Sequence, residues 1–589
     1  MTCGRGKAGA PLSAIVADGF HRATFHRLFA LRFFVGAFGL LVNVRITAIV
    51  VPREIVRGSL ATEVAIDALI VDVKLACDVL GVTICNISHS NSYLRELCAR
   101  HPKDQARFLS REGFPGLSCA EMRKTKIIAT LGPATESPEM IARLIDAGMN
   151  IVRLNMSHAQ HDWVRRVVKD IRAAAKEREV AVGILMDTQG PAIRTGDLPT
   201  ALDLQPGQKF VLTVRGEKSE EVHSVDVNYE NFVNDIDVGD VVLIDNGQIH
   251  MKVMAKHGNK VECEVLTPGK LGSRRHINLP GVKVSLPPLT EKDRADVRVG
   301  LEVGVDMFAL SFVREANDLR ELRKMFEKET HKPLVVAKIE DQSAVQNIND
   351  IIHESDAIMV ARGDLGIEVP FEELPIIQRK IVKICQRVGR PVIVATHMLE
   401  SMISNPHPTR AEITDVANAV FEQADAMMLS GETTVGKYPV KCVEVLDRVA
   451  RRIERSGGAN YQEFADLTSP RQKLVKSAVV MADELRAEAI LVFTVRGSMA
   501  RNTAWLRPRY SPIFAFCERW YVANELTLNR SVVPFTIPYD HEVPENNVTL
   551  AIDTLKKRGL LHKGNTVVII ASMDAGKQLA DAVQMRVVD

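Results

Sequence analysis

The chain has 589 residues, of which 46% are hydrophobic and 25% charged, and its formal net charge is +2. At roughly 100–200 residues per domain this length predicts three or four domains, with ample apolar material for a large core. The nearly balanced charge gives no strong field for nucleic acid or an anionic membrane, so neither is expected as a partner. Nine cysteines without a CxxC pair argue against a zinc ribbon or a disulfide scaffold and favour a reducing compartment.

Residues 1–121 differ from the rest of the chain. Up to Pro52 the only acidic residue is Asp18, and the apolar run FFVGAFGLLV at 33–42 is too short to span a bilayer. Three interpretations stay open: an organelle transit peptide, a spurious translated leader, or a small appended domain. We favour the first two, because a regular pattern starts abruptly at Met122. The expected location is cytoplasmic, or a plastid or mitochondrion if the segment is a transit peptide.

From residue 126 onward, short apolar runs rich in β-branched residues alternate with helical stretches. Such runs are typical of strands buried on both faces of a parallel sheet, and eight of them separated by helices predict a (β/α)8 TIM barrel. The predicted barrel strands are 126–132, 150–156, 181–187, 306–312, 334–340, 357–363, 391–397 and 426–432.

The predicted barrel is interrupted after its third strand. Residues 195–284 contain the alternating runs KFVLTVR, VVLIDNG, IHMKVMAK and KVECEVL with turns between them, which predicts a small inserted β-barrel domain. The barrel domain then comprises 122–194 and 285–465. Residues 466–589 return to the α/β pattern and predict a C-terminal open α/β domain, whose strands are 489–495, 512–518, 532–538 and 566–572.

Candidate site residues lie where the predicted barrel strands end, because active sites of such barrels sit at the C-terminal face. Arg153, Asn155 and Ser157 alternate along the second strand and face one way, offering a cation and two neutral oxygens. A capped turn with a surface arginine is the competing interpretation. Asp187 and Thr188 end the third strand, where an acid is also common as a turn residue.

Two later strand ends carry opposite charges. Lys338 and Glu340 share one face of the fifth strand, either as functional groups or as a structural ion pair. Asp364 follows Gly363 after the sixth strand, and with Glu340 it offers two carboxylates to a hard divalent cation such as Mg²⁺. Thr396, after the seventh strand, is a candidate for substrate binding or proton relay, with a helix N-cap as the alternative.

Together these strand ends predict a phosphoryl-transfer cavity, in which positioning and charge neutralisation supply most of the catalysis. Glu432, after the eighth strand, is expected either to pair with Lys338 or Arg153 or to be a first-turn acid of a helix. The chain lacks GxxxxGK[ST], which argues against a P-loop enzyme, and lacks HRD and DFG, which argues against a protein kinase fold.

The segments IVRLNMSH, GPAIRTG, VVAKIE, MVARGDLGIE, VATHMLESM, PTRAEITDVANAV and MLSGETTVGKYP resemble the pyruvate kinase family, in family order from about Met122 to the end. The resemblance implies phosphoryl transfer from phosphoenolpyruvate to ADP, giving pyruvate and ATP. Lys338 and Arg153 would neutralise the phosphoryl group in flight, and Glu340 and Asp364 would bind Mg²⁺ or Mn²⁺. A lid domain and a homotetramer are also implied.

The resemblance also implies the remaining ligand contacts. Gly363, Asp364 and Thr396 would hold the carboxylate of phosphoenolpyruvate, and a water near Thr396 would deliver the proton to the enolate. The monovalent-cation site, usually for potassium, would be formed by Asn155, Ser157, Asp187 and Thr188. The nucleotide-binding residues would be Asn155, His158, Arg194 and Arg275.

Three positions depart from the family pattern. Gln189 replaces a usual lysine, and Ala192 replaces the glutamate or lysine that decides whether potassium is needed, so potassium dependence is open. Met499 replaces a serine or threonine of the effector-phosphate loop, which puts fructose 1,6-bisphosphate regulation in doubt. Arg496 and Ser498 remain candidates for binding another sugar phosphate or AMP.

Two rival functions use the same residues. One is another metal-dependent barrel enzyme acting on a 2-oxo acid, which would need neither a β lid nor nucleotide contacts. The other is a catalytically decayed regulatory homologue, against which the presence of Lys338, Glu340, Asp364 and Thr396 argues. Pyruvate-coupled ATP formation separates the predicted kinase from both.

Overall fold

The computed structural model describes residues 119–214, 223–574 and 579–589. The predictions about residues 1–118, including the leader and its apolar run, lie outside the described residues. All of the described residues belong to one compact unit. Among its described residues, no helix is both long and apolar enough to cross a membrane.

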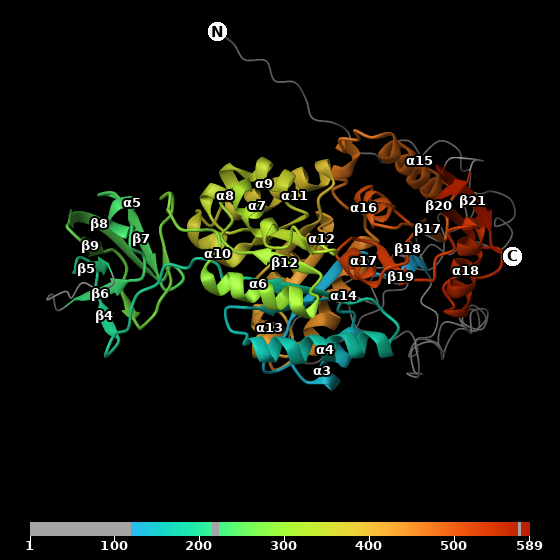
Figure 1. The fold of residues 1–589 in the computed structure, drawn as a ribbon. Coiled ribbons are helices and arrows are strands. Elements are labelled where there is room, and N and C mark those ends of the chain that lie inside the picture. The colour runs from blue at the N-terminus through green and yellow to red at the C-terminus, as the bar shows by residue number, and fades with distance from the viewer. Residues whose placement is uncertain (1–118, 215–222, 575–578) are drawn as a thin grey trace, which may run out of the picture. The chain divides into compact units, whose positions relative to one another are not determined.

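Eight parallel strands close into a barrel, which confirms the predicted TIM-barrel fold (Figure 1). Around the barrel the strands follow the order β1-β16-β15-β14-β13-β12-β3-β2. The strands are β1 (Lys126–Thr130), β2 (Ile151–Asn155), β3 (Gly183–Asp187), β12 (Met307–Leu310), β13 (Leu334–Ile339), β14 (Ala357–Ala361), β15 (Val392–Ala395) and β16 (Ala426–Leu429).

Successive strand residues point alternately into the barrel and toward the surrounding helices, so both faces are apolar. Ile128, Ile151 and Leu185 pack with one another in the barrel interior, whereas Ile127 and Val152 pack in the layer under the helices. Burial on both faces explains why the strands are continuous apolar runs rather than alternating patterns.

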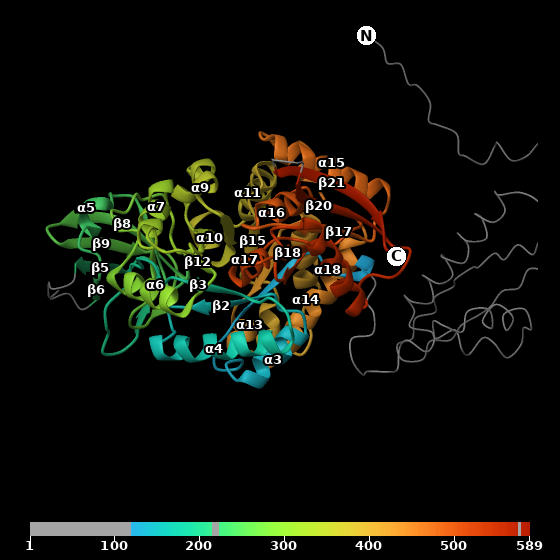
Figure 2. The ribbon, with the colours of Figure 1, turned by 45° about the vertical axis from the view of Figure 1, so that its right-hand side comes forward.

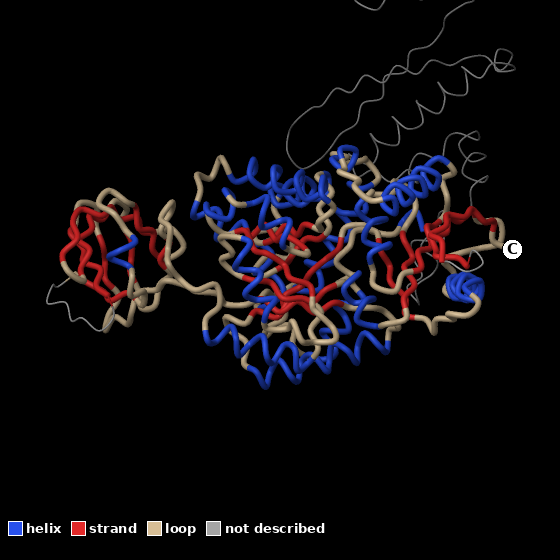
Figure 3. Tube along the Cα trace, turned by 45° about the horizontal axis from the view of Figure 1, so that its top comes forward, coloured by secondary structure: helices blue, strands red, loops and turns tan. Residues whose placement is uncertain are grey.

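Helices follow the barrel strands and cover them, as the blue tubes around the red strands show (Figure 3). Many begin at a side-chain cap: Thr290 and Thr409 each form a capping box with the acid three residues later. The helices are α3 (Pro138–Asp146), α4 (His161–Glu177), α6 (Glu291–Val303), α7 (Ala316–Lys324), α8 (Gln342–Gln346), α9 (Ile348–Glu354), α10 (Arg362–Glu368), α11 (Leu374–Val388), α12 (Arg410–Phe421), α13 (Gly431–Thr434) and α14 (Pro439–Glu454).

The insertion between β3 and β12 is a β domain with its own core around Phe210 and Phe232. It contains a six-stranded sheet of order β11-β7-β8-β9-β5-β6 and a two-stranded sheet of β10 and β4. Its elements are β4 (Leu202–Leu204), β5 (Lys209–Val214), β6 (Ser224–Val227), α5 (Phe232–Asp235), β7 (Val241–Ile244), β8 (Ile249–His257), β9 (Lys260–Val265), β10 (Gly269–Leu271) and β11 (Ile277–Asn278).

The C-terminal domain is an open five-stranded sheet of order β19-β18-β17-β20-β21 (Figure 2). Helices α15 to α17 supply side chains to the core on one face, and α18 supplies them to the core on the other. Its elements are α15 (Pro470–Glu484), β17 (Ala489–Phe493), α16 (Ser498–Trp505), β18 (Ile513–Cys517), α17 (Trp520–Leu526), β19 (Val532–Thr536), α18 (Pro544–Lys557), β20 (Thr566–Asp574) and β21 (Leu579–Val587).

Buried polar contacts join the C-terminal domain to the barrel. The Arg507 guanidinium makes two 2.7 Å bonds with the Asp425 carboxylate, and both side chains are almost fully buried. The Trp505 indole donates to the carbonyl of Gln386 on α11. A planar guanidinium matched to a carboxylate fixes both distance and orientation, so these contacts hold the two domains in one arrangement.

The five cysteines among the described residues are unpaired and buried. They are distributed over all three domains: Cys263 lies in the β domain, Cys385 and Cys442 in barrel helices, and Cys119 and Cys517 in the cores of the C-terminal domain. Burial raises the pKa of the Cys263 thiol to about 12, because it disfavours the charged thiolate.

The short 3-10 helix η3 (Cys119–Glu121) precedes Met122 and packs with the C-terminal domain. The Cys119 thiol donates to the carbonyl of Leu560 at 3.0 Å, and Arg451 donates to the carbonyl of Glu121. A chain that begins at Met122 therefore loses contacts that a chain beginning at Cys119 keeps.

We expect a protein lacking residues 1–118 and one lacking residues 1–121 to be equally active, since neither truncation touches the barrel ends. The shorter protein should be less stable by about 1 kcal/mol, the value of burying one small side chain. Denaturant unfolding of the two proteins, followed by the fluorescence of Trp505 and Trp520, measures this difference. Equal stability would show that η3 contributes nothing.

Candidate active site

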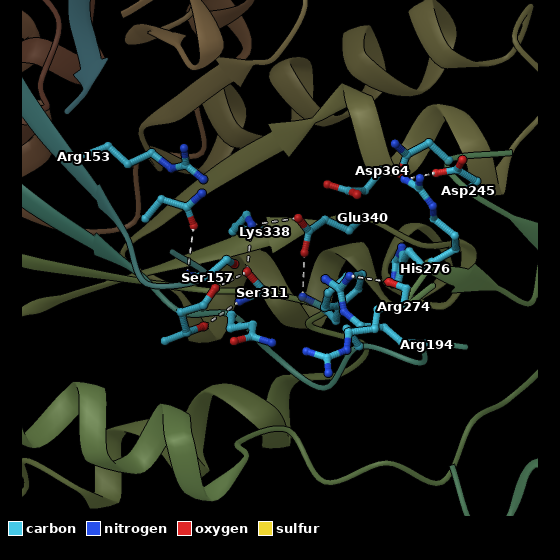
Figure 4. Close-up of a pocket in the computed structure, with 17 residues that line it drawn as sticks. Arg153, Ser157, Arg194, Asp245, Arg274, His276, Ser311, Lys338, Glu340 and Asp364 are labelled. Carbon is cyan, nitrogen blue, oxygen red and sulfur yellow. Dashed lines mark hydrogen bonds and ion pairs between the residues drawn. The ribbon is translucent and has the colours of Figure 1, made fainter. Parts of the chain in front are cut away.

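A cavity of about 330 Å³ opens at the C-terminal ends of the barrel strands, on the side that faces the β domain (Figure 4). Most of the side chains around it are polar or charged, as expected for a site that binds anions rather than an apolar ligand. They are Arg153, Asn155, Ser157, Thr188, Gln189, Ala192, Arg194, Asp245, Asn246, Arg274, Arg275, His276, Ser311, Phe312, Lys338, Glu340 and Asp364.

Lys338 lies at the centre of this polar cluster. Its ammonium nitrogen is 2.8 Å from a Glu340 oxygen, 3.3 Å from an Asp187 oxygen and 2.7 Å from the Ser311 hydroxyl. Lys338 lies in β13 and Glu340 directly follows it, so that the two side chains, two residues apart, lie on the same side of the chain. The ion pair that the sequence left as an alternative is therefore present, and its lysine also faces the cavity.

Arg153, in the middle of β2, is the second cation of the cluster and is largely buried. Its guanidinium bonds to one Asp187 oxygen at 2.7 Å and donates to the Thr130 hydroxyl at 3.1 Å. Its side chain is only 11% exposed, which excludes the surface-arginine interpretation. Asp187 thus links the two cations without lining the cavity itself, and this contact fixes Arg153 in place beside Lys338.

The charges of this cluster shift one another's pKa values. Burial acts to raise the pKa of Asp187, but Lys338 and Arg153 outweigh it and lower that pKa below its ordinary value. Burial likewise acts to lower the pKa of Lys338, but Asp187 and Glu340 together raise it. Lys338 is therefore a permanent cation at neutral pH, as an electrostatic role requires.

Glu340, directly after β13, and Asp364, in α10, face the same cavity (Figure 4). One Glu340 oxygen accepts from the Phe312 amide at 2.6 Å, while the other contacts Lys338. Burial, reinforced by the nearby Asp364 charge, raises the pKa of Glu340 to about 7 in the absence of a metal. A divalent cation would offset the repulsion that the Asp364 charge exerts on Glu340, and carboxylate oxygens are ligands that a hard cation prefers.

These two carboxylates fit a divalent cation that takes its remaining ligands from substrate and water. Among the described residues there is no group of three or more His, Cys, Asp or Glu side chains placed to hold a metal. An all-protein cage is therefore absent from this part of the chain, whereas magnesium commonly binds through one or two carboxylates plus phosphate oxygens and water.

Gly363 and Thr396 lie just outside the cavity lining. The Thr396 hydroxyl accepts from the Gly363 amide at 2.7 Å and donates to the Ala395 carbonyl at 2.6 Å. Thr396 has a positive φ of 67°, a conformation that β-branched residues rarely adopt. The structure thus joins Thr396 to the start of α10, the helix that carries Asp364.

The four residues predicted for a monovalent cation lie near one another at the ends of β2 and β3. The Asn155 side chain accepts from the Ser157 amide at 3.2 Å, and the Thr188 hydroxyl donates to the Ala309 carbonyl at 3.2 Å. Asn155, Ser157 and Thr188 line the cavity, whereas Asp187 lies behind it, engaged with Arg153 and Lys338.

The predicted nucleotide contacts divide into two groups. Arg194, Arg275 and Asn155 line the cavity, and Arg275 lies 3.3 Å from Asp245 of the β domain. His158 is exposed and does not line the cavity. Arg194 and Arg275 therefore face the cavity from the insertion and its first linker, opposite the barrel cations.

Two residues at strand ends were missed by the sequence analysis. Ser311 follows β12 and contacts Lys338, and Thr130 ends β1 and contacts Arg153. Their positions at the C-terminal ends of barrel strands could have marked both as candidate site residues. Of the two options for Glu432, the structure supports the first-turn acid: Glu432 lies in the first turn of α13, and its carboxylate accepts from the backbone amides of Leu399 and Ser430.

We expect Asp187→Asn to destabilise the protein by about 3–5 kcal/mol at pH 7, because it leaves two buried cations without their shared carboxylate. The pKa of Asp187 is lowered from 3.8, so its contribution is present above that pH and is lost as the pH falls through the folded value. Urea unfolding should show a constant difference from pH 8 to pH 5. A difference that vanished already at pH 5 would contradict this account.

A barrel with cations, two carboxylates and neutral oxygens at its C-terminal face, facing an inserted β domain, defines a metal-dependent phosphotransferase. Comparison with known proteins identifies the family within this class. Residues 122–443 match the family "Pyruvate kinase, barrel domain", and residues 472–585 match "Pyruvate kinase, alpha/beta domain". The chain belongs to the pyruvate kinase family.

Individual relatives agree with this assignment. The chain is 42% identical over 460 residues to plastidial pyruvate kinase 2 of Arabidopsis thaliana, covering 76% of this chain and 78% of that protein. It is 41% identical over 475 residues to pyruvate kinase of Geobacillus stearothermophilus, covering 77% and 78%. A solved pyruvate kinase from Cryptosporidium parvum has a TM-score of 0.76 at 33% identity, covering 80% of this chain and 97% of that one.

Proposed function

We propose that this enzyme transfers the phosphoryl group of phosphoenolpyruvate to ADP and thereby forms pyruvate and ATP. The observation that carries the proposal is the convergence of Lys338, Arg153, Glu340 and Asp364 on one cavity. Two fixed cations suit the transferring phosphoryl group, and two carboxylates suit the cation that such reactions need.

The residues divide the work by position. Lys338 and Arg153, held by Asp187, take up the negative charge of the phosphoryl group as it moves between oxygens. Arg194 and Arg275 hold the nucleotide phosphates on the opposite side, with Asn155 and His158 as further contacts. Gly363 and Thr396 orient the carboxylate of the three-carbon substrate through the start of α10. The β domain excludes water while the group is transferred.

Metal dependence follows from the donor set. Glu340 and Asp364 would hold Mg²⁺ or Mn²⁺, which when bound supplies charge neutralisation for the phosphoryl and enolate oxygens. Asn155, Ser157, Asp187 and Thr188 would hold potassium. Because Ala192 carries no charge, we leave the potassium requirement to experiment. The proton that converts enolate to pyruvate comes through water near Thr396.

The proposal is tested by a lactate-dehydrogenase-coupled assay of the full chain with phosphoenolpyruvate, ADP and Mg²⁺, run with and without potassium. We expect NADH oxidation that requires ADP and is abolished by EDTA. Direct measurement of ATP excludes simple hydrolysis of the substrate. Manganese binding without turnover would instead favour a decayed homologue, and metal-dependent chemistry on a 2-oxo acid without ATP would favour another barrel enzyme.

Regulation, assembly and location are further parts of the proposal. Arg496 and Ser498 flank Gly497 at the start of α16 and are the candidate site for a sugar phosphate or AMP. Activity titrations with each compound, with Arg496→Ala as control, test this site.

We expect a homotetramer, measurable by light scattering. The cytoplasm is the expected location, with a plastid or mitochondrion as the alternative that an import assay of residues 1–121 decides.

A further inference from the structure

Helix α10 connects the candidate metal site with the β domain. It spans only Arg362–Glu368, so Asp364 in its first turn and Glu368 at its end belong to one short rigid element. Asp364 faces the cavity. The end of the helix contacts the β domain in two places.

The first contact is a buried hydrogen bond between Asn278 and Glu368. The Asn278 amide nitrogen donates to a Glu368 oxygen at 2.8 Å, and the two residues are 4% and 8% exposed. Asn278 belongs to β11, which pairs with β7 and is thus part of the sheet of the β domain. The carbonyl oxygen of the Asn278 side chain is buried and has no partner among the described residues, so the Glu368 bond is what holds this side chain.

The second contact lies at the turn between β7 and β8. A Cβ atom added to Gly247 would lie 3.2 Å from a methyl carbon of Ile367, so the turn packs closely against α10 at this glycine. Gly247 has a positive φ of 75°, which also favours glycine. The two residues before it, Asp245 and Asn246, line the cavity. The same turn thus contacts α10 and forms part of the site wall.

The end of α10 is also fixed to the barrel. Gln342 donates from its side chain to the Glu368 carbonyl, which ties the helix end to the start of α8. Burial is the main factor that raises the pKa of Glu368 to about 7, and the charges of Asp341 and Asp364 add to it. Glu368 is therefore close enough to Asp364 to respond electrostatically to it, consistent with one compact unit.

From these contacts we propose that Glu368 is a positioning residue, which through its bond to Asn278 couples the placement of Asp364 to the position of the β domain. The inference rests on the proposed function, in which Asp364 holds the divalent cation. If the β domain moves toward or away from the cavity, the Asn278–Glu368 bond displaces the end of α10 with it. Because α10 is a short helix, Asp364 in its first turn is displaced as well. An active site is sensitive to such shifts, because a misplacement of about 1 Å can cost about 100-fold in rate.

The test compares four variants of the full chain. Glu368→Ala and Asn278→Ala remove the bond from either side, and the double variant removes both partners. Glu368→Gln keeps an oxygen that accepts from Asn278 and has the same size. Thr267→Val is the matched control, since Thr267 makes its side-chain hydrogen bonds within the β domain and has none to α10.

We expect each alanine variant to lower kcat about 10- to 100-fold with a smaller change in the KM for ADP. The double variant should be no worse than the more impaired single variant, because both singles break one bond. Glu368→Gln should stay within about threefold of wild type. Thr267→Val should keep wild-type kcat even if its stability falls.

Hydrogen exchange of the metal-free proteins supplies a readout that does not depend on turnover. The peptide covering 362–369 should exchange about tenfold faster in both alanine variants and at the wild-type rate in Glu368→Gln and Thr267→Val. Additive losses in the double variant, or wild-type kcat and exchange in both alanine variants, would overturn the coupling. An inactive wild type would instead refute the proposed function, and the exchange data would still decide the coupling.

Discussion

Lys338→Met is expected to lower the rate of ATP formation by about 10³-fold or more, while the protein still folds. Within the part of the chain that the structure describes, Lys338 is the one cation that contacts both Asp187 and Glu340, and the two carboxylates raise its pKa. Removing a single preorganised donor from a buried site commonly costs about 10²–10³ in kcat, and a full charge is worth more than a neutral donor. Methionine has a similar length and fills the same space.

The coupled assay measures this loss, with Lys324→Met as control. Lys324 is an exposed lysine of α7 whose partner is Glu321, and it does not line the cavity. The Lys338→Met enzyme should still promote proton exchange at the methyl group of pyruvate, because that step does not transfer a phosphoryl group. Full ATP formation by Lys338→Met would remove this residue from the mechanism.

Asp364→Asn should have a comparable effect through a different cause. It leaves Glu340 as the one remaining carboxylate of the proposed metal site, and the charge stabilisation that a metal supplies is worth several kcal/mol. Since 1.36 kcal/mol corresponds to a factor of ten, we expect kcat/KM to fall by about 10³. The fall should be partly reversed by excess metal, which distinguishes it from the loss in Lys338→Met.

Manganese binding followed by electron paramagnetic resonance provides the direct measurement. Asp364→Asn should bind Mn²⁺ more weakly than wild type, whereas Asp350→Asn, a change of an exposed acid in the first turn of α9, should bind it normally. Unchanged Mn²⁺ affinity in Asp364→Asn would show that this carboxylate is not a ligand, and the two-carboxylate account of the site would fail.

The barrel could be predicted because its strands are apolar on both faces and end in recognisable charged residues. Lys338 and Glu340 share a strand face whatever the rest of the fold does, so their proximity follows from local geometry. Ser311 was missed for the opposite reason, since a serine after a strand carries no charge to mark it. Its role depends on the neighbouring strand β13, which brings Lys338 to it.

Strand β21 and the Asn278–Glu368 contact could not be predicted from the sequence. The segment LADAVQMRV is rich in residues that favour helices, yet pairing with β20 makes it an antiparallel edge strand. Asn278 and Glu368 lie 90 residues apart, and neither belongs to a motif whose spacing would join them. In both cases contacts between residues that are distant in the sequence determine the structure, and no local sequence pattern indicates them.

Each of the three domains contains at least one buried cysteine, so the reactivity of these thiols reports on the unfolding of each domain separately. A thiolate is the reactive form, and the raised pKa values of Cys263 and Cys517, both about 12, leave almost none of it at neutral pH in the folded state. Alkylating reagents should therefore leave these five cysteines unmodified in the native protein. Brief exposure to such a reagent at increasing denaturant concentrations, followed by peptide mass analysis, would show the concentration at which each domain unfolds. Alkylation of Cys263 reports on the β domain, that of Cys442 on the barrel and that of Cys517 on the C-terminal domain.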